Sequence, residues 1–188
     1  MTRIIAGEYG GRRLTTPAGD RTRPTSDRVR EALFGSLESA GRLTDAAVLD
    51  LYAGSGAIGL EAVSRGAAHA LLIEAHQATG RVITRNIRQL GAGDRARLLI
   101  ANLPQALRRQ PPQRFDLVVA DPPYGVDDGE VAETLAALVE NHWLADEADV
   151  VLERPRRASE PPWPNGITTV RSRRYGESTL WYGRALWI

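Results

Sequence analysis

Apolar runs alternate with amphipathic stretches along most of this chain. The runs from about residue 47 onward are short and largely apolar, which is typical of buried strands, and most are followed by residues at helical spacing. We expect strands near residues 47–52, 69–74, 97–101, 115–121, 148–153, 166–174 and 179–187, and helices near 57–66, 76–91, 103–109 and 129–142. Strands that alternate with helices predict a parallel sheet, and the last two runs predict a C-terminal antiparallel hairpin. The pattern therefore predicts an α/β fold with a seven-stranded, mostly parallel sheet.

The residues before the first of these strands predict two further elements. Residues 3–16 alternate around a pair of glycines, which indicates a small β-hairpin outside the core. Ser26 or Asp27 can cap a helix that runs to about Ser39 with apolar side chains along one face. There is no repeat or obvious linker, and 188 residues are the size of one domain. We therefore expect a single domain.

The apolar run 115–120 ends in the segment Asp121-Pro122-Pro123-Tyr124. Two prolines cannot continue a strand, and they hold the preceding carbonyls in a stiff geometry. The Asp121 carboxylate and a rigid carbonyl can accept both hydrogens of an exocyclic amino group, and Tyr124 offers a ring on which a nucleobase can stack. The alternative is a plain turn with Tyr124 at its rim. The motif by itself leaves both interpretations open.

A glycine-rich turn follows the predicted strand near 47–52. The spacing of Gly54, Gly56 and Gly59 between a strand and a helix fits a nucleotide-binding turn. Glu74 comes 20 residues after Gly54, at the end of the next apolar run, where an acid can bind ribose hydroxyls. The spacing therefore allows either a nicotinamide cofactor or an adenosyl cofactor.

Asp50 favours the adenosyl cofactor. It precedes the first glycine of the turn by four residues, at the tip of the strand. A dinucleotide site must receive a pyrophosphate there, and a carboxylate would repel it, whereas a ligand with ammonium and sulfonium groups would be attracted. The alternative interpretation of Asp50 is an ordinary acid at a strand end that is solvated or caps the following turn.

These motifs resemble those of the class I S-adenosylmethionine-dependent methyltransferases. Residues 50–59 are similar to the first motif of that superfamily, and residues 121–124 to the Asn/Asp-Pro-Pro-aromatic motif of its amino-methylating branch. Segments 5–14 and 22–34 resemble the opening of RsmD-type enzymes, which methylate the N2 amino group of one guanine in bacterial 16S ribosomal RNA. The resemblance spans nearly the whole chain. It implies a Rossmann-like sheet, S-adenosylmethionine as cofactor, and ribosomal RNA or a small-subunit assembly intermediate as partner.

The resemblance also implies a division of the chain and roles for particular residues. Within a single domain of residues 1–188, residues 1–22 form the hairpin extension and residues 23–188 the S-adenosylmethionine-binding catalytic core. The residues implied to bind the cofactor are Arg23, Thr25, Asp50, Tyr52, Gly54, Gly56, Glu74, Asn102 and Leu103. Those implied to act on the amine are Asp121, Pro122, Pro123 and Tyr124. Asp121 either takes a proton or only orients the amine, and the sequence does not decide between these roles.

The positive charge of the chain gathers at its two ends. Residues 1–30 carry seven arginines against three acids, residues 153–188 carry the same numbers, and every basic residue is arginine. Arginine binds phosphate through two parallel hydrogen bonds and stacks on bases, although a single surface arginine is as often simply solvated. The candidates for RNA contact are Arg12, Arg13, Arg28, Arg30, Arg173 and Arg174.

Several classes of protein are disfavoured. The chain has no cysteine and its three histidines are scattered, so we expect no metal. It has no apolar signal run at its start and no segment that approaches 18 consecutive apolar residues, so we expect no membrane association and a cytoplasmic location. We also expect a monomer.

Other activities remain as alternatives. The four-residue motif is shared by amino-methyltransferases that act on DNA adenine or on protein glutamine, and only the N-terminal segments point to guanine. A nicotinamide-dependent oxidoreductase and a non-catalytic ribosome-binding factor are the less favoured alternatives.

Overall fold

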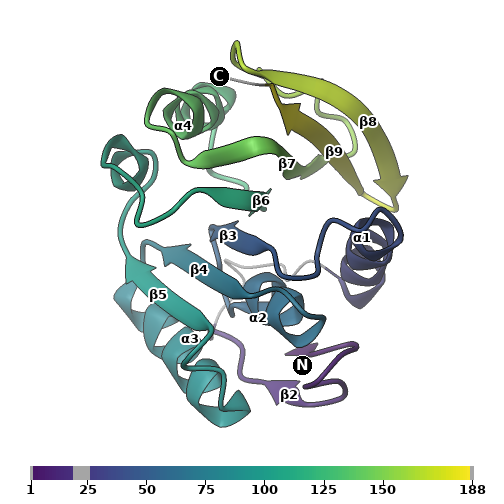
Figure 1. Ribbon diagram of the computed structural model, residues 1–188, viewed down its shortest axis with the longest axis vertical. Coiled ribbons are helices and arrows are strands. Elements are labelled where there is room, and N and C mark those ends of the chain that lie inside the picture. Colours follow the sequence, from purple (N-terminus) through teal and green to yellow (C-terminus); the bar gives the residue numbers. More distant parts are fainter. Residues whose placement is uncertain (1, 19–25, 187–188) are drawn as a thin grey trace.

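The computed structural model describes residues 2–18 and 26–186, and its main feature is a seven-stranded sheet with helices on both faces (Figure 1). The order of strands across the sheet is β5-β4-β3-β6-β7-β9-β8. The strands are β3 (Ala47–Leu51), β4 (His69–Glu74), β5 (Ala96–Ile100), β6 (Phe115–Ala120), β7 (Leu144–Pro155), β8 (Ile167–Tyr175) and β9 (Ser178–Ala185). The first five are mutually parallel, and β9 pairs antiparallel with both β7 and β8. The predicted α/β class and the C-terminal hairpin are confirmed.

Two hydrophobic cores lie on opposite faces of this sheet because successive side chains of a strand point to opposite sides. Val48 of β3 packs into the core beneath the first three helices, whereas Leu49 packs into the core beneath the fourth. The helices of the first face are α1 (Asp27–Ser39), α2 (Ala57–Ser64) and α3 (Gln77–Leu90), and those of the second are the 3-10 helix η1 (Gln105–Arg108) and α4 (Asp128–Glu140). Both faces of the central strands are therefore buried, which explains their nearly continuous apolar runs.

The N-terminal hairpin consists of β1 (Thr2–Arg3) and β2 (Arg13–Leu14), which pair antiparallel. It lies beside α2 and α3 rather than over the sheet (Figure 1). The predicted hairpin is confirmed, but its strands are only two residues long because a turn occupies most of the segment between them.

Two predicted elements differ in extent from the structure. Strand β7 begins at Leu144, four residues before the predicted start, and its register against β6 shifts between Phe115 and Leu117. Glu147 lies within this irregular part of β7 with a positive φ of 58°, so the polar pair Asp146-Glu147, whose composition does not suggest a strand, is included in it. The helix predicted near 103–109 is only the short 3-10 turn η1.

Candidate active site

The order of strands reverses between β3 and β6, because β4 and β5 lie to one side of β3 while β6 and β7 lie to the other. Ligands of open α/β sheets bind beyond the carboxyl ends of the strands at such a point. Leu51 of β3 is opposite Ala120 of β6, so the chain leaves the two strands side by side, through Tyr52 and Asp121. The sheet therefore brings the two motifs of the sequence to the same end of two neighbouring strands.

The glycine turn that follows β3 has a backbone that favours glycine. Gly54 and Gly56 have φ angles of 58° and 80°, and the Gly56 N–H donates to the Ala53 carbonyl at 2.7 Å. A Cβ atom at Gly56 would lie 3.0 Å from Leu72 Cδ2 on β4. The turn therefore lies tightly against the sheet, and α2 begins immediately after it.

Asp50 lies directly beneath this turn and is 1% exposed. Its Oδ2 accepts a hydrogen bond from the Gly59 N–H at 2.9 Å, so it binds the first turn of α2. The pKa of Asp50 is raised from 3.8 to about 7, chiefly by burial; the hydrogen bond from Gly59 opposes this rise, and the charges of Asp121 and Glu74 add to it. The capping role that the sequence allowed for Asp50 is therefore present, and the charges of two nearby carboxylates act on it.

Glu74, at the end of β4, joins its own strand to the glycine turn. Its Oε2 accepts from the Gly54 N–H at 3.0 Å and its Oε1 from the His76 N–H at 2.9 Å. The carboxylate is buried and held by both of these backbone groups. Sequence reasoning assigned Glu74 to a ligand and missed this structural role, for which only its buried strand-end position gave a signal.

Tyr52 has a positive φ of 61°, which is uncommon for a residue with a side chain. Its half-buried ring lies on the α4 side of the sheet, and its hydroxyl is 3.4 Å from Thr134 Oγ1. Burial raises the pKa of the Tyr52 hydroxyl, against the lowering effect of Thr134. The side chain therefore stiffens the contact between the site and α4.

The segment after β5 leaves the sheet at the same end, because β5 is parallel to β4. Asn102 is exposed, and its carbonyl accepts from the Ala106 N–H at 2.9 Å, while Leu103 is half-buried against the core beneath α4. Ile100, which is opposite Glu74 in the sheet, is 40% exposed. Sequence reasoning missed this partly exposed apolar side chain because it lies within a strand pattern.

The segment Asp121–Tyr124 leaves β6 toward α4. Asp121 and Pro122 are half-buried, whereas Tyr124 is 77% exposed. A turn closes behind the tyrosine, where the Val126 N–H donates to the Pro123 carbonyl at 2.9 Å. The motif therefore presents an accessible aromatic ring beside the carboxylate cluster.

The chain matches the family model described as "Conserved hypothetical protein 95" over residues 2–184. It belongs to this family. Ribosomal RNA small subunit methyltransferase D of Escherichia coli K12 is 41% identical over 93% of this chain and 85% of its own length. The protein of the same name in Haemophilus influenzae is 34% identical over 80% of this chain and 77% of its own length. The solved structure of yhhF from Escherichia coli is 36% identical and superposes with a TM-score of 0.86 over 99% of this chain and 98% of that one.

The arginines predicted to contact RNA have different surroundings in this member of the family. Arg12 donates to the Leu90 carbonyl at 3.1 Å and to the Gln89 carbonyl, so it caps the end of α3. Arg30 is fully buried and donates to the Arg3 carbonyl at 2.7 Å and to Asp27 at 2.8 Å. All members of the set other than Arg30 are exposed: Arg12, Arg13, Arg28, Arg173 and Arg174.

Two of the predicted cofactor ligands, Arg23 and Thr25, lie outside the described residues. Within the part of the chain that is described, no group of three His, Asp or Glu side chains is placed to hold a metal ion. Among the same residues, no helix is long and apolar enough to cross a membrane.

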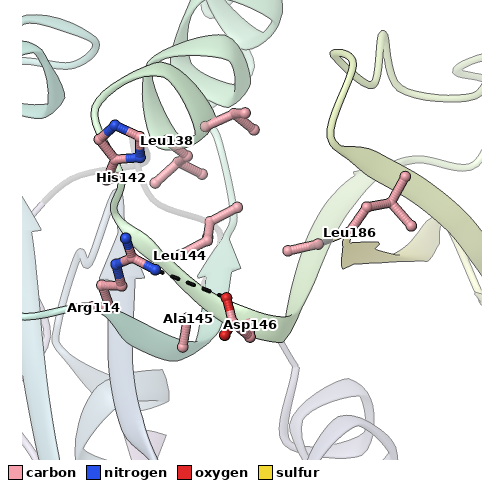
Figure 2. A pocket seen from close by; sticks show the side chains of 9 residues that line it. Arg114, Leu138, His142, Leu144, Ala145, Asp146 and Leu186 are labelled. Carbon is pink, nitrogen blue, oxygen red and sulfur yellow. Dashed lines mark ion pairs between the residues drawn. The ribbon is translucent and has the colours of Figure 1, made fainter. Parts of the chain in front are cut away.

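A small hollow lies near the amino ends of β6 and β7, whereas the site lies beyond their carboxyl ends. Figure 2 shows the side chains that line this hollow. It is lined by Leu144 and Asp146 at the start of β7, by Arg114 before β6 and by Leu186 after β9, and Arg114 and Asp146 form an ion pair there at 3.8 Å. A volume of about 10 Å³ accommodates about one water molecule. The hollow is therefore too small for a cofactor and lies far from the converging carboxylates.

Proposed function

We propose that this protein transfers a methyl group from S-adenosylmethionine to the exocyclic N2 amino group of a guanine in small-subunit ribosomal RNA. The observation that carries the proposal is the convergence at the switch point of the sheet: Asp50 and Glu74 lie at the glycine turn, and Asp121 begins the neighbouring loop. Membership of the family and the 41% identity to an rRNA methyltransferase support the same activity.

The residues at the switch point suit S-adenosylmethionine. The charges of Asp121 and Glu74 raise the pKa of buried Asp50, which means that a positive group between them would relieve a repulsion. When bound, S-adenosylmethionine supplies a methyl group activated by its positively charged sulfonium. Asp50 and the Gly54 and Gly56 backbone would hold the methionine part of the cofactor.

Residues at the ends of β4 and β5 would hold the ribose and the adenine of the cofactor. Glu74 would bind the ribose, and Asn102 and Leu103 the adenine. The partly exposed Ile100, opposite Glu74 in the sheet, offers an apolar surface beside them. We propose that Arg23 and Thr25 bind the methionine carboxylate. Tyr52 would stabilise the adjacent part of the site through its contact with Thr134 of α4.

Asp121 acts on the amine in this proposal. The lone pair of guanine N2 is delocalised into the ring, so the nitrogen must be oriented and its developing positive charge accepted. The Asp121 carboxylate accepts one N–H and the Pro122 carbonyl the other, while Pro123 keeps the carbonyl rigid. Tyr124 is exposed enough to stack on the base once the base has left its neighbours in the RNA.

The RNA would approach the sheet at the carboxyl ends of its parallel strands. Strand β8 runs parallel to β7, since both pair antiparallel with β9, and Tyr175 and Pro155 are both opposite Ser178. Arg173 and Arg174 therefore lie at the same end of the strands as Asp121. We retain these two with Arg13 and Arg28 as phosphate-binding candidates and withdraw Arg30, because its guanidinium is buried, and Arg12, because it caps α3.

The wider setting is part of the same proposal. Residues 1–22 serve as an extension and residues 23–188 as the catalytic core of one domain. We propose a monomer that works in the cytoplasm, where ribosomal subunits assemble, on ribosomal RNA or on an assembly intermediate.

A methyl-transfer assay with labelled S-adenosylmethionine tests the function. We expect transfer to ribosomal RNA or to small subunits that lack the modification, and none to duplex DNA. Asp121→Ala should lower kcat by roughly 100-fold or more, because it removes the acceptor that faces the amine. Asp121→Asn keeps an acceptor without the charge and should retain part of the rate. Full activity in Asp121→Ala would refute the role of Asp121, and transfer to DNA alone would refute the substrate.

A further inference from the structure

Arg154 connects β7 to the loop that carries the Asp121–Tyr124 motif. Its guanidinium forms a close ion pair with Asp128, the first residue of α4. The Arg154 side chain is 12% exposed, whereas that of Asp128 is 67% exposed. Leu152 of β7 is opposite Ala120 of β6, so Arg154 lies just beyond the point at which the motif leaves the sheet.

The loop between β6 and α4 is short of backbone donors, because Pro122 and Pro123 have no N–H. The Val126 N–H donates to the Pro123 carbonyl behind Tyr124, and the Asp127 side chain caps α4 by accepting from the Glu130 N–H at 2.8 Å. One end of the loop is fixed by β6. The other end is the start of α4, which Arg154 binds through Asp128.

Stability alone does not explain an arginine at this position. Within the described part of the chain, the Nε of Arg154 is buried without a hydrogen-bond partner, which is unfavourable for a charged group. An apolar side chain in a largely buried position is commonly as stable or more stable. Asp128 does not need a partner either, since an acid is already favourable in the first turn of a helix.

We propose that Arg154 is a positioning residue for methyl transfer: through Asp128 it fixes the start of α4 and so holds the Asp121–Tyr124 loop in its reactive shape. This inference rests on the proposed function. It assigns no contact between Arg154 and the substrate. Displacing a reacting group by about 1 Å can cost roughly 100-fold in rate, so a small movement of this loop matters.

Kinetics test the proposal through both members of the pair. Arg154→Met and Asp128→Asn should each lower kcat roughly tenfold, while the KM for RNA and the Kd for S-adenosylmethionine change less than about twofold. The double variant should be no slower than either single variant, because both remove the same contact. Arg154→Lys should recover most of the rate.

The chain contains a matched control. Arg108 and Glu133 form another ion pair to α4, at 3.5 Å, with both side chains more than 60% exposed. Arg108→Met and Glu133→Gln should leave kcat unchanged. If the losses in Arg154→Met and Asp128→Asn multiply in the double variant, or if Arg154→Met keeps the wild-type kcat, the proposal is wrong.

Hydrogen exchange supplies a readout that does not depend on the substrate. Amides of the segment 124–128 should exchange faster in Arg154→Met and in Asp128→Asn than in the wild type, and at the wild-type rate in Arg108→Met. Unchanged exchange together with a lower kcat would mean that Arg154 acts on the substrate, which overturns the positioning role. Failure of the wild type to methylate ribosomal RNA would refute the proposed function, and the exchange rates would still decide whether Arg154 holds the loop.

Discussion

At the scale of single residues, Asp50 has the capping role that the sequence offered as one alternative, and its surroundings are compatible with the proposed contact to a positive ligand. It binds the Gly59 N–H at the start of α2, and it remains close enough to Asp121 and Glu74 to be affected by their charges. A buried carboxylate costs the folded protein stability when it ionises. Asp50 is therefore kept at this position at some cost, which fits a group that meets a positive ligand.

The raised pKa of Asp50 predicts how stability depends on pH. The pKa is about 7 in the folded protein and 3.8 ordinarily, so between these values the folded state holds a proton that the unfolded chain releases. The free energy of unfolding should therefore fall as the pH rises from about 4 to about 7, by an amount on the order of 4 kcal/mol. Asp50→Asn should remove most of this fall and keep an acceptor for Gly59.

Urea denaturation at pH 5 and at pH 7.5 measures the effect. Asp94→Asn, which changes an exposed carboxylate, is the control and should follow the wild type. A wild-type stability that rises steadily over this range and is unaffected by Asp50→Asn would contradict the assignment.

At the scale of elements, the N-terminal segment is attached to α2 through the buried Glu61 and through Ser64, whose Oγ accepts from the Tyr9 N–H at 2.9 Å. Glu61 is fully buried and accepts from the Ile5 N–H at 2.8 Å and the Ala6 N–H at 3.0 Å, and Arg65 donates to it at 2.7 Å. Nothing in the local pattern of α2 distinguishes this glutamate from a surface residue. The hairpin could be predicted from its own alternation, but its attachment could not, because the partners are more than 50 residues apart.

Glu61→Ala should therefore destabilise the protein by about 3 kcal/mol. The substitution leaves the two N–H groups of the N-terminal segment without their acceptor. Arg65 keeps Glu31 and Glu38 as partners, so its charge remains compensated. The free energy of unfolding measures the loss. Glu140→Ala, at an exposed position at the end of α4, should change it by less than about 0.5 kcal/mol, and an equal effect of the two substitutions would count against the attachment.

At the scale of the whole molecule, the order of strands brings segments that are distant in sequence to the same end of the sheet. The segment between β7 and β8 carries the chain back across the sheet, so that β8 runs in the same direction as β7, and β9 then inserts antiparallel between them. The basic carboxyl end of β8 therefore lies at the end of the sheet from which the motif projects. The excess of arginine near the C-terminus, which the sequence showed only as a composition, thereby acquires a position relative to Asp121.

This arrangement predicts a salt-dependent effect on RNA binding. Replacing Arg173 and Arg174 together by Gln should weaken binding and reduce the slope of log K against log salt concentration by about 1 to 2, since each phosphate contact contributes roughly 0.7 to 0.9. Arg85→Gln with Arg88→Gln, two exposed arginines in the second half of α3, should leave the slope unchanged. If the two double variants changed the slope equally, the RNA would not bind preferentially at the carboxyl end of β8.

The sequence by itself determined the elements and the type of chemistry. Hydrophobic periodicity, the glycine turn and the rigid Asp121–Tyr124 segment depend on residues close together in the chain, and such local patterns can be recognised without coordinates. Only the tertiary structure decided which groups meet. The ion pair of Arg154 with Asp128 and the burial of Arg30 arise from the packing of separate elements, as do the bonds of Glu74 to the glycine turn. Their physical reason lies in the order of strands across the sheet, which sets neighbours that sequence distance does not reveal.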